Sequence, residues 1–268
     1  MARSDYSFIL RAGDRGHDRI DSTGAASSYV AGHPESFIVR NSSFNFNTYQ
    51  TGRPGFGPMR VFGDEVFNGA GCGYNMHPHH NFIIAAFVTQ GQLTHVNTVG
   101  NVDQLSPGDY YVFSAGSGGK HAELSIDGED LHVIYMWFLP EQLLAPPSYR
   151  RAHFDLRTRR NRIEQLVGDA DGTLPIGQDV RVSRLVSDAG KRYAYSLRSP
   201  AHAVYAFVLE GRIRLGEADL GRRDSAGLCG ASPIECVVSD DETDVLFVET
   251  LMTDDARLRA WAEDQPRA

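Results

Sequence analysis

Two pairs of potential metal ligands stand out in this chain, because the two residues of each pair are two positions apart. His77 and His79 lie on either side of a proline, and His121 and Glu123 lie on either side of an alanine. On a β-strand, residues i and i+2 point to the same face, so each pair directs two donor groups the same way. If two such strands meet in a small barrel, three imidazoles and one carboxylate converge on one point. The spacing therefore predicts a metal site made of His77, His79, His121 and Glu123.

The chemistry of this donor set restricts the choice of metal. A mixed set of nitrogen and oxygen ligands suits divalent iron, nickel, cobalt, copper, manganese or zinc better than calcium or magnesium, which prefer oxygen ligands alone. Four protein ligands leave one or two coordination positions open on an ion that accepts five or six. Because an open position is typical of a catalytic metal rather than a structural one, the pattern indicates an enzyme.

The other candidate ligands have no partner at this spacing. Among the 10 histidines, His95 and His132 lie on expected strands with no second donor two residues away, so we interpret both as structural. His80 follows His79 and points to the opposite face, toward solvent or a second layer around the metal. Cys72 could add a soft ligand, but its glycine-rich surroundings favour a turn.

Composition and charge exclude several classes of protein. A chain of 268 residues with 41% hydrophobic and 22% charged residues is typical of a globular protein with one large or two smaller domains. Its net charge of −8 and the lack of a long basic run argue against binding to nucleic acid. We expect no membrane segment, because no apolar stretch reaches about 18 residues. Three cysteines without a CxxC pair favour a reducing, cytoplasmic location.

Short β-rich segments separated by turn residues dominate the chain, and helical periodicity is scarce. This pattern is typical of barrels and sandwiches. The strongest strand is expected at 82–89, and Gln90-Gly91 turns it into an alternating strand at 92–97. Further strands are expected at 110–114, 131–138, 180–186, 192–197, 203–209, 212–215 and 245–251.

The two halves of the chain share a pattern. Residues 203–211 echo residues 83–91, which indicates an internal duplication. Two consecutive prolines at 146 and 147, followed by an arginine cluster, indicate a connector. We therefore predict a metal-binding domain at 1–144 and a second domain at 145–268 that lacks metal ligands, because it offers only His202. A short C-terminal helix is expected from Thr253 onward.

These motifs resemble those of the pirins, two-domain members of the cupin superfamily. The resemblance is carried by residues 56–62, the His77-Pro78-His79 triplet, the glycine hairpin at 91–101, the Pro-Gly-Asp turn at 107–109 and the segment 115–123. It implies an all-β fold of two tandem double-stranded β-helix (cupin) barrels, with metal only in the first. The family is generally one of iron proteins, so Fe(II) is the metal that the resemblance implies. Several members resemble quercetinases, and others are linked to transcriptional co-regulation.

One departure from the family concerns the pocket. After the HPH triplet the family continues Arg-Gly-Phe-Glu, whereas this chain has Ile83 at the position of the glutamate. Counting alternate residues along the strand, we expect Ile83, Ala85 and Phe87 to face the metal and to form an apolar substrate pocket.

Three hypotheses for function remain at this point. The first is an oxygenase that opens a phenolic, flavonol-like or polyketide-like aromatic substrate with O2, in which Glu123 is both a metal ligand and the catalytic base. The second is a non-oxidative cyclase, isomerase or dehydratase that uses the same metal as a Lewis acid. The third is a non-catalytic metal sensor or regulatory binding protein. Fold analogy does not choose among them.

Overall fold

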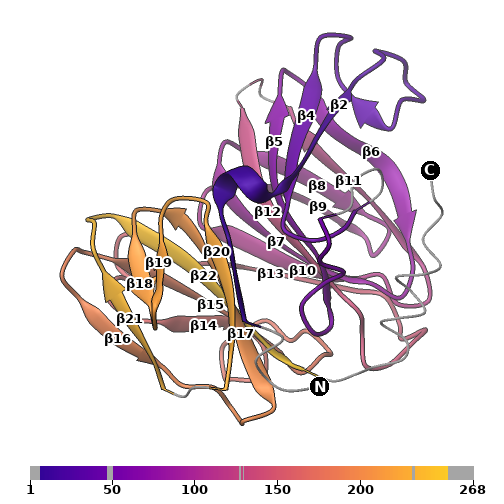
Figure 1. Ribbon diagram of the computed structural model, residues 1–268. Helices are drawn as coiled ribbons and strands as arrows, with labels where there is room; N and C mark the ends of the chain where they lie inside the picture. Colours follow the sequence, from indigo (N-terminus) through magenta and orange to yellow (C-terminus); the bar gives the residue numbers. More distant parts are fainter. Residues whose placement is uncertain (1–6, 47–50, 127, 129, 231–232, 253–268) are drawn as a thin grey trace. The chain divides into compact units, whose positions relative to one another are not determined.

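The computed structural model describes residues 7–46, 51–126, 128, 130–230 and 233–252 (Figure 1). Within these residues the chain is almost entirely β-sheet, and its one helix is a short 3-10 turn, η2, at Ala12–Asp14. No helix in the described part of the chain is long and apolar enough to cross a membrane. The C-terminal helix expected after Thr253 lies outside the described residues.

The metal-ligand motifs lie in a barrel of two sheets. One sheet has seven strands in the order β13-β10-β7-β12-β5-β4-β2, and the other has five in the order β3-β6-β11-β8-β9. Their bounds are β2 Gly16–Asp21, β3 Val30–Ala31, β4 Phe37–Ser42, β5 Met59–Asn68, β6 Cys72–His79, β7 Ile83–Gln90, β8 Leu93–Asn97, β9 Asn101–Leu105, β10 Asp109–Ser114, β11 Gly119–Ser125, β12 Leu131–Phe138 and β13 Ser148–His153.

A second barrel repeats this plan with the later part of the chain. Its sheets have the orders β1-β20-β17-β22-β15-β14 and β16-β21-β18-β19. Their bounds are β1 Phe8–Leu10, β14 Glu164–Val167, β15 Val180–Ser187, β16 Arg192–Tyr195, β17 His202–Glu210, β18 Ile213–Leu215, β19 Ala218–Leu220, β20 Ser225–Cys229, β21 Ile234–Val238 and β22 Thr243–Leu251. The strands predicted from the sequence are confirmed, and so is the fold of two all-β barrels.

Each barrel closes around its own apolar core, to which both of its sheets contribute. In the first barrel, Ile84, Ala86 and Val88 of β7 pack with residues such as Tyr74 of β6 and Tyr111 of β10. In the second barrel the core is built in the same way from β15 to β22. Burial of one face of each sheet drives this closure, because apolar area removed from water stabilises the fold by about 25 cal/mol per Å².

The hairpin glycines confirm the internal duplication. Gly91 follows β7 with φ 73°, and Gly211 follows β17 with φ 80°. A Cβ at Gly91 would lie 2.7 Å from the carbonyl oxygen of Asp130, and one at Gly211 would lie 2.3 Å from Oγ1 of Thr243. Both turns therefore need glycine for backbone conformation and for space.

The division into units differs from the predicted boundary between residues 144 and 145. One compact unit comprises Gly16–Gly55 and Met59–Phe154, and the other comprises residues 7–15, Phe56–Pro58 and residues 155–252. The reason is strand pairing: β13 pairs with β10 in the first barrel, and β1 pairs with β20 in the second. The connector after the first barrel therefore contains the arginine cluster at 157–162, and the two prolines at 146 and 147 precede the last strand of that barrel.

Candidate metal centre

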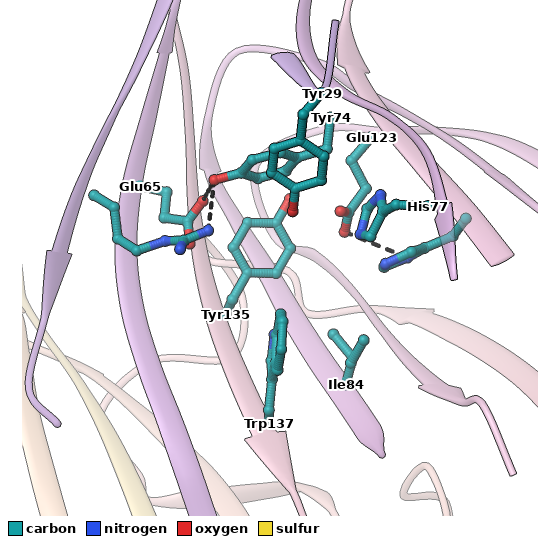
Figure 2. Close-up of a pocket in the computed structure, with 10 residues that line it drawn as sticks. Tyr29, Glu65, Tyr74, His77, Ile84, Glu123, Tyr135 and Trp137 are labelled. Atoms are coloured by element: carbon teal, nitrogen blue, oxygen red, sulfur yellow. Dashed lines mark hydrogen bonds and ion pairs between the residues drawn. The ribbon is translucent and has the colours of Figure 1, made fainter. Parts of the chain in front are cut away.

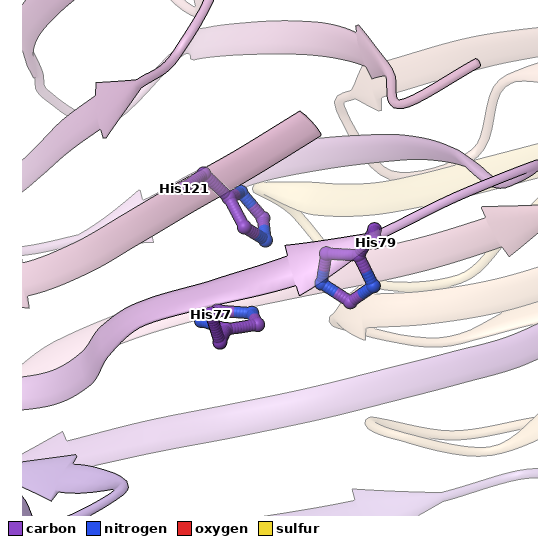
Figure 3. A group of neighbouring side chains, drawn as sticks. All are labelled: His77, His79 and His121. Carbon is purple, nitrogen blue, oxygen red and sulfur yellow. The ribbon is translucent and has the colours of Figure 1, made fainter. Parts of the chain in front are cut away.

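Three of the four predicted ligands converge inside the first barrel. His77 and His79 extend from β6, and His121 extends from the neighbouring strand β11, where it is paired in register with His77 (Figure 3). The ring centroids are 4.5 Å apart for His77 and His121, 4.8 Å for His77 and His79, and 4.9 Å for His79 and His121. One ring nitrogen from each lies within 4.8 Å of the others, a spacing from which three imidazoles can hold one ion.

We name His77, His79 and His121 the histidine triad. Their ring nitrogens are available to bind a metal ion. The Nδ1 atom of His77 lies 2.7 Å from the carbonyl oxygen of Asn75, so an Nδ1–H can donate there and leave Nε2 free. The Nε2 atoms of His79 and His121 are buried and have no hydrogen-bond partner among the described residues. Burial lowers the pKa of His79 to about 3 and that of His121 well below its ordinary value. Neutral imidazoles with unpaired buried nitrogens are what a metal ion requires, so the donor set fits the predicted metal.

Glu123 lies beside this triad and contacts the other side of His121. Its Oε1 atom is 3.6 Å from Nδ1 of His121, and it accepts a hydrogen bond from the hydroxyl of Tyr111. Glu123 forms a second group of potential ligands with His95 and His121. Burial raises the pKa of the Glu123 carboxyl to about 8. The structure therefore brings the three predicted histidines together and places the predicted carboxylate next to them.

His95 is the site residue that the sequence analysis missed. Its Nε2 atom lies 3.2 Å from Nδ1 of His121, and its ring is completely buried and stacks on Tyr149 at 5.0 Å. The sequence analysis interpreted His95 as structural because no second donor lies two residues away, and the structure places it against a residue of the triad. The pairing arises because β8 lies beside β11, with His95 opposite Glu123. No local spacing in the sequence carries that information.

A β-bulge sets the directions of the side chains on β6. Residues His121 and Glu123 of β11 pair with His77 and Tyr74 of β6, so two residues of β6 lie opposite Ala122. Without the bulge, two residues three apart on a strand would point to opposite faces. With it, both Tyr74 and His77 line the interior of the barrel.

Gly73 of β6 lies against β11, and its substitution by alanine tests how closely these two strands pack. A Cβ at Gly73 would lie 1.9 Å from the carbonyl oxygen of Glu123 and 2.7 Å from Cα of Leu124, so β6 and β11 would have to separate. We expect Gly73→Ala to lower the free energy of unfolding by about 2–3 kcal/mol, measured by urea denaturation. Gly13→Ala is the control, because its Cβ would meet nothing within 4 Å. Equal stability of the two variants would contradict the close packing.

A small cavity of about 10 Å³ adjoins the triad (Figure 2). Beside His77 and His121 it is lined by Tyr29, Arg40, Glu65, Tyr74, Ile84, Glu123, Tyr135 and Trp137. Its polar end is a buried hydrogen-bond network. The sequence alone did not predict this network, because its residues come from three different strands. Arg40 Nε donates to Glu65 at 2.7 Å, Arg40 Nη2 donates to the Tyr74 hydroxyl at 2.6 Å, and that hydroxyl donates to Glu65 at 2.7 Å.

The residue of β7 that lines the cavity is one position away from the predicted one. Ile84, rather than Ile83, lines the cavity, and Ile84, Ala86 and Val88 belong to the core of the first barrel. Ile83, Ala85 and Phe87 are buried on the opposite face of β7, where Phe87 stacks on Tyr110 at 5.3 Å. The alternation of side-chain direction along β6 cannot be continued into β7, because a turn at 80–82 separates the two strands.

The remaining predictions concern residues outside the triad. His80 is exposed, as expected. Cys72 is buried and its thiol lies 3.4 Å from the carbonyl oxygen of Phe37, so it belongs to neither group of potential ligands. In the second barrel, His202 contacts Asp179 at 3.2 Å and Ser199 at 2.8 Å, and no potential metal group includes it among the described residues.

Comparison with known proteins agrees with this architecture. Residues 21–138 match the Pirin family, and residues 168–250 match the quercetinase C-terminal cupin domain. A quercetin 2,3-dioxygenase of Escherichia coli is 27% identical over 243 residues, which cover 90% of this chain and 97% of that protein. A pirin-like protein of Caulobacter vibrioides is 28% identical over 222 residues, which cover 81% of this chain and 94% of that protein.

Solved structures share the fold along nearly the whole chain. The crystal structure of YhhW from Escherichia coli superposes with a TM-score of 0.78 at 23% identity, over 93% of this chain and 99% of that one. A structure described as the bacterial pirin YhhW in complex with nickel(II) superposes with a TM-score of 0.78 at 22% identity, over 92% and 100% of the two chains. With family matches in both barrels and this shared fold, the chain belongs to the pirin family of the cupin superfamily.

Proposed function

We propose that this protein is a metal-dependent dioxygenase that acts on a phenolic, flavonol-like or polyketide-like aromatic substrate, as the name quercetin 2,3-dioxygenase of its Escherichia coli relative suggests. The metal, Fe(II) as the first candidate, would be held by His77, His79 and His121. Glu123, which now lies beside Nδ1 of His121, would be the fourth ligand once its side chain turns toward the ion. The observation that carries the proposal is the buried histidine triad, whose Nε2 atoms on His79 and His121 have no protein partner among the described residues. A pirin of known structure binds nickel(II), which supports a site for a divalent transition metal.

The residues around the triad orient it and exclude water. A redox-active divalent ion, when bound, would supply open positions for a phenolic oxygen and for O2 and would lower the pKa of the phenol. The carbonyl of Asn75 orients His77, and His95 orients His121. The Tyr111 hydroxyl donates to Glu123, whose carboxyl group, when ionised, would accept the proton of the substrate hydroxyl through a water molecule in the cavity. The buried walls of the cavity keep bulk water away from these transfers.

Substitution of His95 tests the orienting role of this residue. We expect His95→Leu to weaken nickel(II) binding about 10- to 100-fold, because the partner of His121 Nδ1 is lost. His95→Gln should recover part of that affinity, since its amide can still hydrogen-bond to His121. Competition with a chelator measures the affinity, and His132→Gln, on a strand outside the triad, is the control. Nickel affinity that is the same in all three variants would show that His95 only fills space.

Oxygen consumption separates the proposed function from its alternatives. The purified chain, stripped of metal and reloaded with Fe(II) or Ni(II), is mixed with quercetin in an oxygen electrode cell. We expect quercetin loss with an equal molar uptake of O2, dependent on the added metal. Conversion of quercetin without O2 uptake would favour the non-oxidative alternative. A metal-loaded protein that converts no member of a phenol panel would overturn the proposal and favour a binding or sensing role.

A further inference from the structure

Residues of the histidine triad line two spaces of very different size. His77 and His121 line the inner cavity, whose volume of about 10 Å³ holds about one water molecule. Tyr29 lies between this cavity and solvent, because it lines the cavity, is 51% exposed and packs edge-on against His77 at 5.5 Å. Pockets for ligands of drug size measure about 300–1,000 Å³. The inner cavity is therefore too small for an aromatic substrate.

The third histidine, His79, lines a hollow of about 580 Å³. This hollow shares no lining residue with the inner cavity. We name this hollow the outer groove; its lining residues are Pro78, His79, His80, Thr98, Gly118, Gly119 and Lys120. Its volume falls in the range of small-molecule sites. Because an ion held by the triad would contact His79, a ligand in the outer groove lies next to the metal centre without entering the barrel.

The outer groove has the chemistry of a site for a flat anion. None of its seven lining residues carries a carboxylate. Lys120 is exposed and forms no ion pair with a described residue, in a chain with only two lysines and a net charge of −8. Lys120 lies opposite Pro78 in the pairing of β11 with β6, and its backbone N–H donates to Oγ1 of Thr98 at 2.9 Å. Lys120 therefore belongs to a paired strand and lines the outer groove together with Pro78, Gly118 and Gly119.

We propose that the outer groove binds the organic substrate as a planar aromatic anion, with an ionised phenol or carboxylate group paired to Lys120. The ring lies on Pro78 and the backbone of Gly119, and its reacting edge faces His79. The inner cavity is left for a molecule the size of water. This inference rests on the proposed function for the identity of the reaction, but the binding that it describes needs no turnover.

Equilibrium binding of two probes tests the outer groove. Quercetin carries acidic hydroxyls, whereas flavone has the same ring system without them, and binding of each to metal-free protein is followed by absorbance and by quenching of protein fluorescence. We expect Lys120→Glu to raise the Kd for quercetin about tenfold at low salt, with a smaller effect at about 1 M salt. The Kd for flavone should change less than twofold. Lys120→Met should have an intermediate effect on quercetin.

Two matched variants show whether the effect is local. Lys191→Glu makes the same charge change in the second barrel and should leave both Kd values unchanged. Tyr29→Ala enlarges the mouth of the inner cavity and should not alter quercetin binding. The inference is overturned if quercetin binding responds to Tyr29→Ala and not to Lys120→Glu, if Lys191→Glu has an equal effect, or if the wild-type protein binds no quercetin. Quercetin binding that depends on Lys120 without O2 uptake would retain the groove and reject the proposed reaction.

Discussion

Replacing His121 by alanine should reduce bound metal from about one ion per chain to nearly none and abolish oxygen-dependent turnover. His121 is central to the site, because its ring contacts both other histidines of the triad and its Nδ1 atom faces His95. Its loss leaves two imidazoles from one strand and the Glu123 carboxyl, which lies on the far side of the removed ring, and this set binds a divalent ion weakly. Metal content after dialysis, measured by inductively coupled plasma mass spectrometry, checks this expectation.

The control for this variant is His80→Ala, next in sequence to a triad residue but exposed. We expect it to keep the full metal content. A second measurement guards against misfolding: a metal present at about 100 times its Kd stabilises the native state by about 2.7 kcal/mol, and only the His121→Ala variant should lose this increment. If His121→Ala retained stoichiometric metal, the triad would not be the metal site.

Replacing Glu123 by glutamine should preserve much of the metal and remove most of the turnover. The three imidazoles remain in Glu123→Gln, and the amide can still accept the hydrogen bond of Tyr111 through its oxygen. The amide cannot take up a proton, so we expect kcat with quercetin to fall about 10²- to 10⁴-fold while KM changes little. Steady-state O2 uptake, normalised to the metal content of each sample, measures the effect.

Tyr111→Phe provides the matched comparison for the carboxylate. It removes the hydroxyl that donates to Glu123 and leaves the carboxylate itself in place. Its effect on kcat should be smaller than that of Glu123→Gln, because the base is less well oriented but still present. Unchanged turnover in Glu123→Gln would refute the role of Glu123 as a base and leave it as a metal ligand or a structural residue.

The sequence by itself determined the β-architecture and the histidine triad. Alternating apolar residues and glycine turns specify strands through local conformational preferences, and the Gln90-Gly91 and Glu210-Gly211 hairpins revealed the duplication for the same reason. His77 and His79 share a face because they are two apart on one strand, which requires no tertiary information. The pairing of His77 with His121 then brings the third imidazole to the other two.

The tertiary structure alone decided the surroundings of that triad. His95 reaches His121 because β8 lies beside β11, and Arg40, Glu65 and Tyr74 meet only because three strands bring them together. Strand pairing also moved the unit boundary, since β1 and β13 each pair with strands far from them in the chain.

The one-residue error at Ile83 has a related cause. The alternation of side-chain direction is preserved within a regular strand, but a turn can reset it, and residues 80–82 lie between His79 and Ile83. Local sequence therefore determines which residues share a strand face. Only the pairing of distant strands determines which faces meet, because that pairing depends on contacts between residues far apart in the chain.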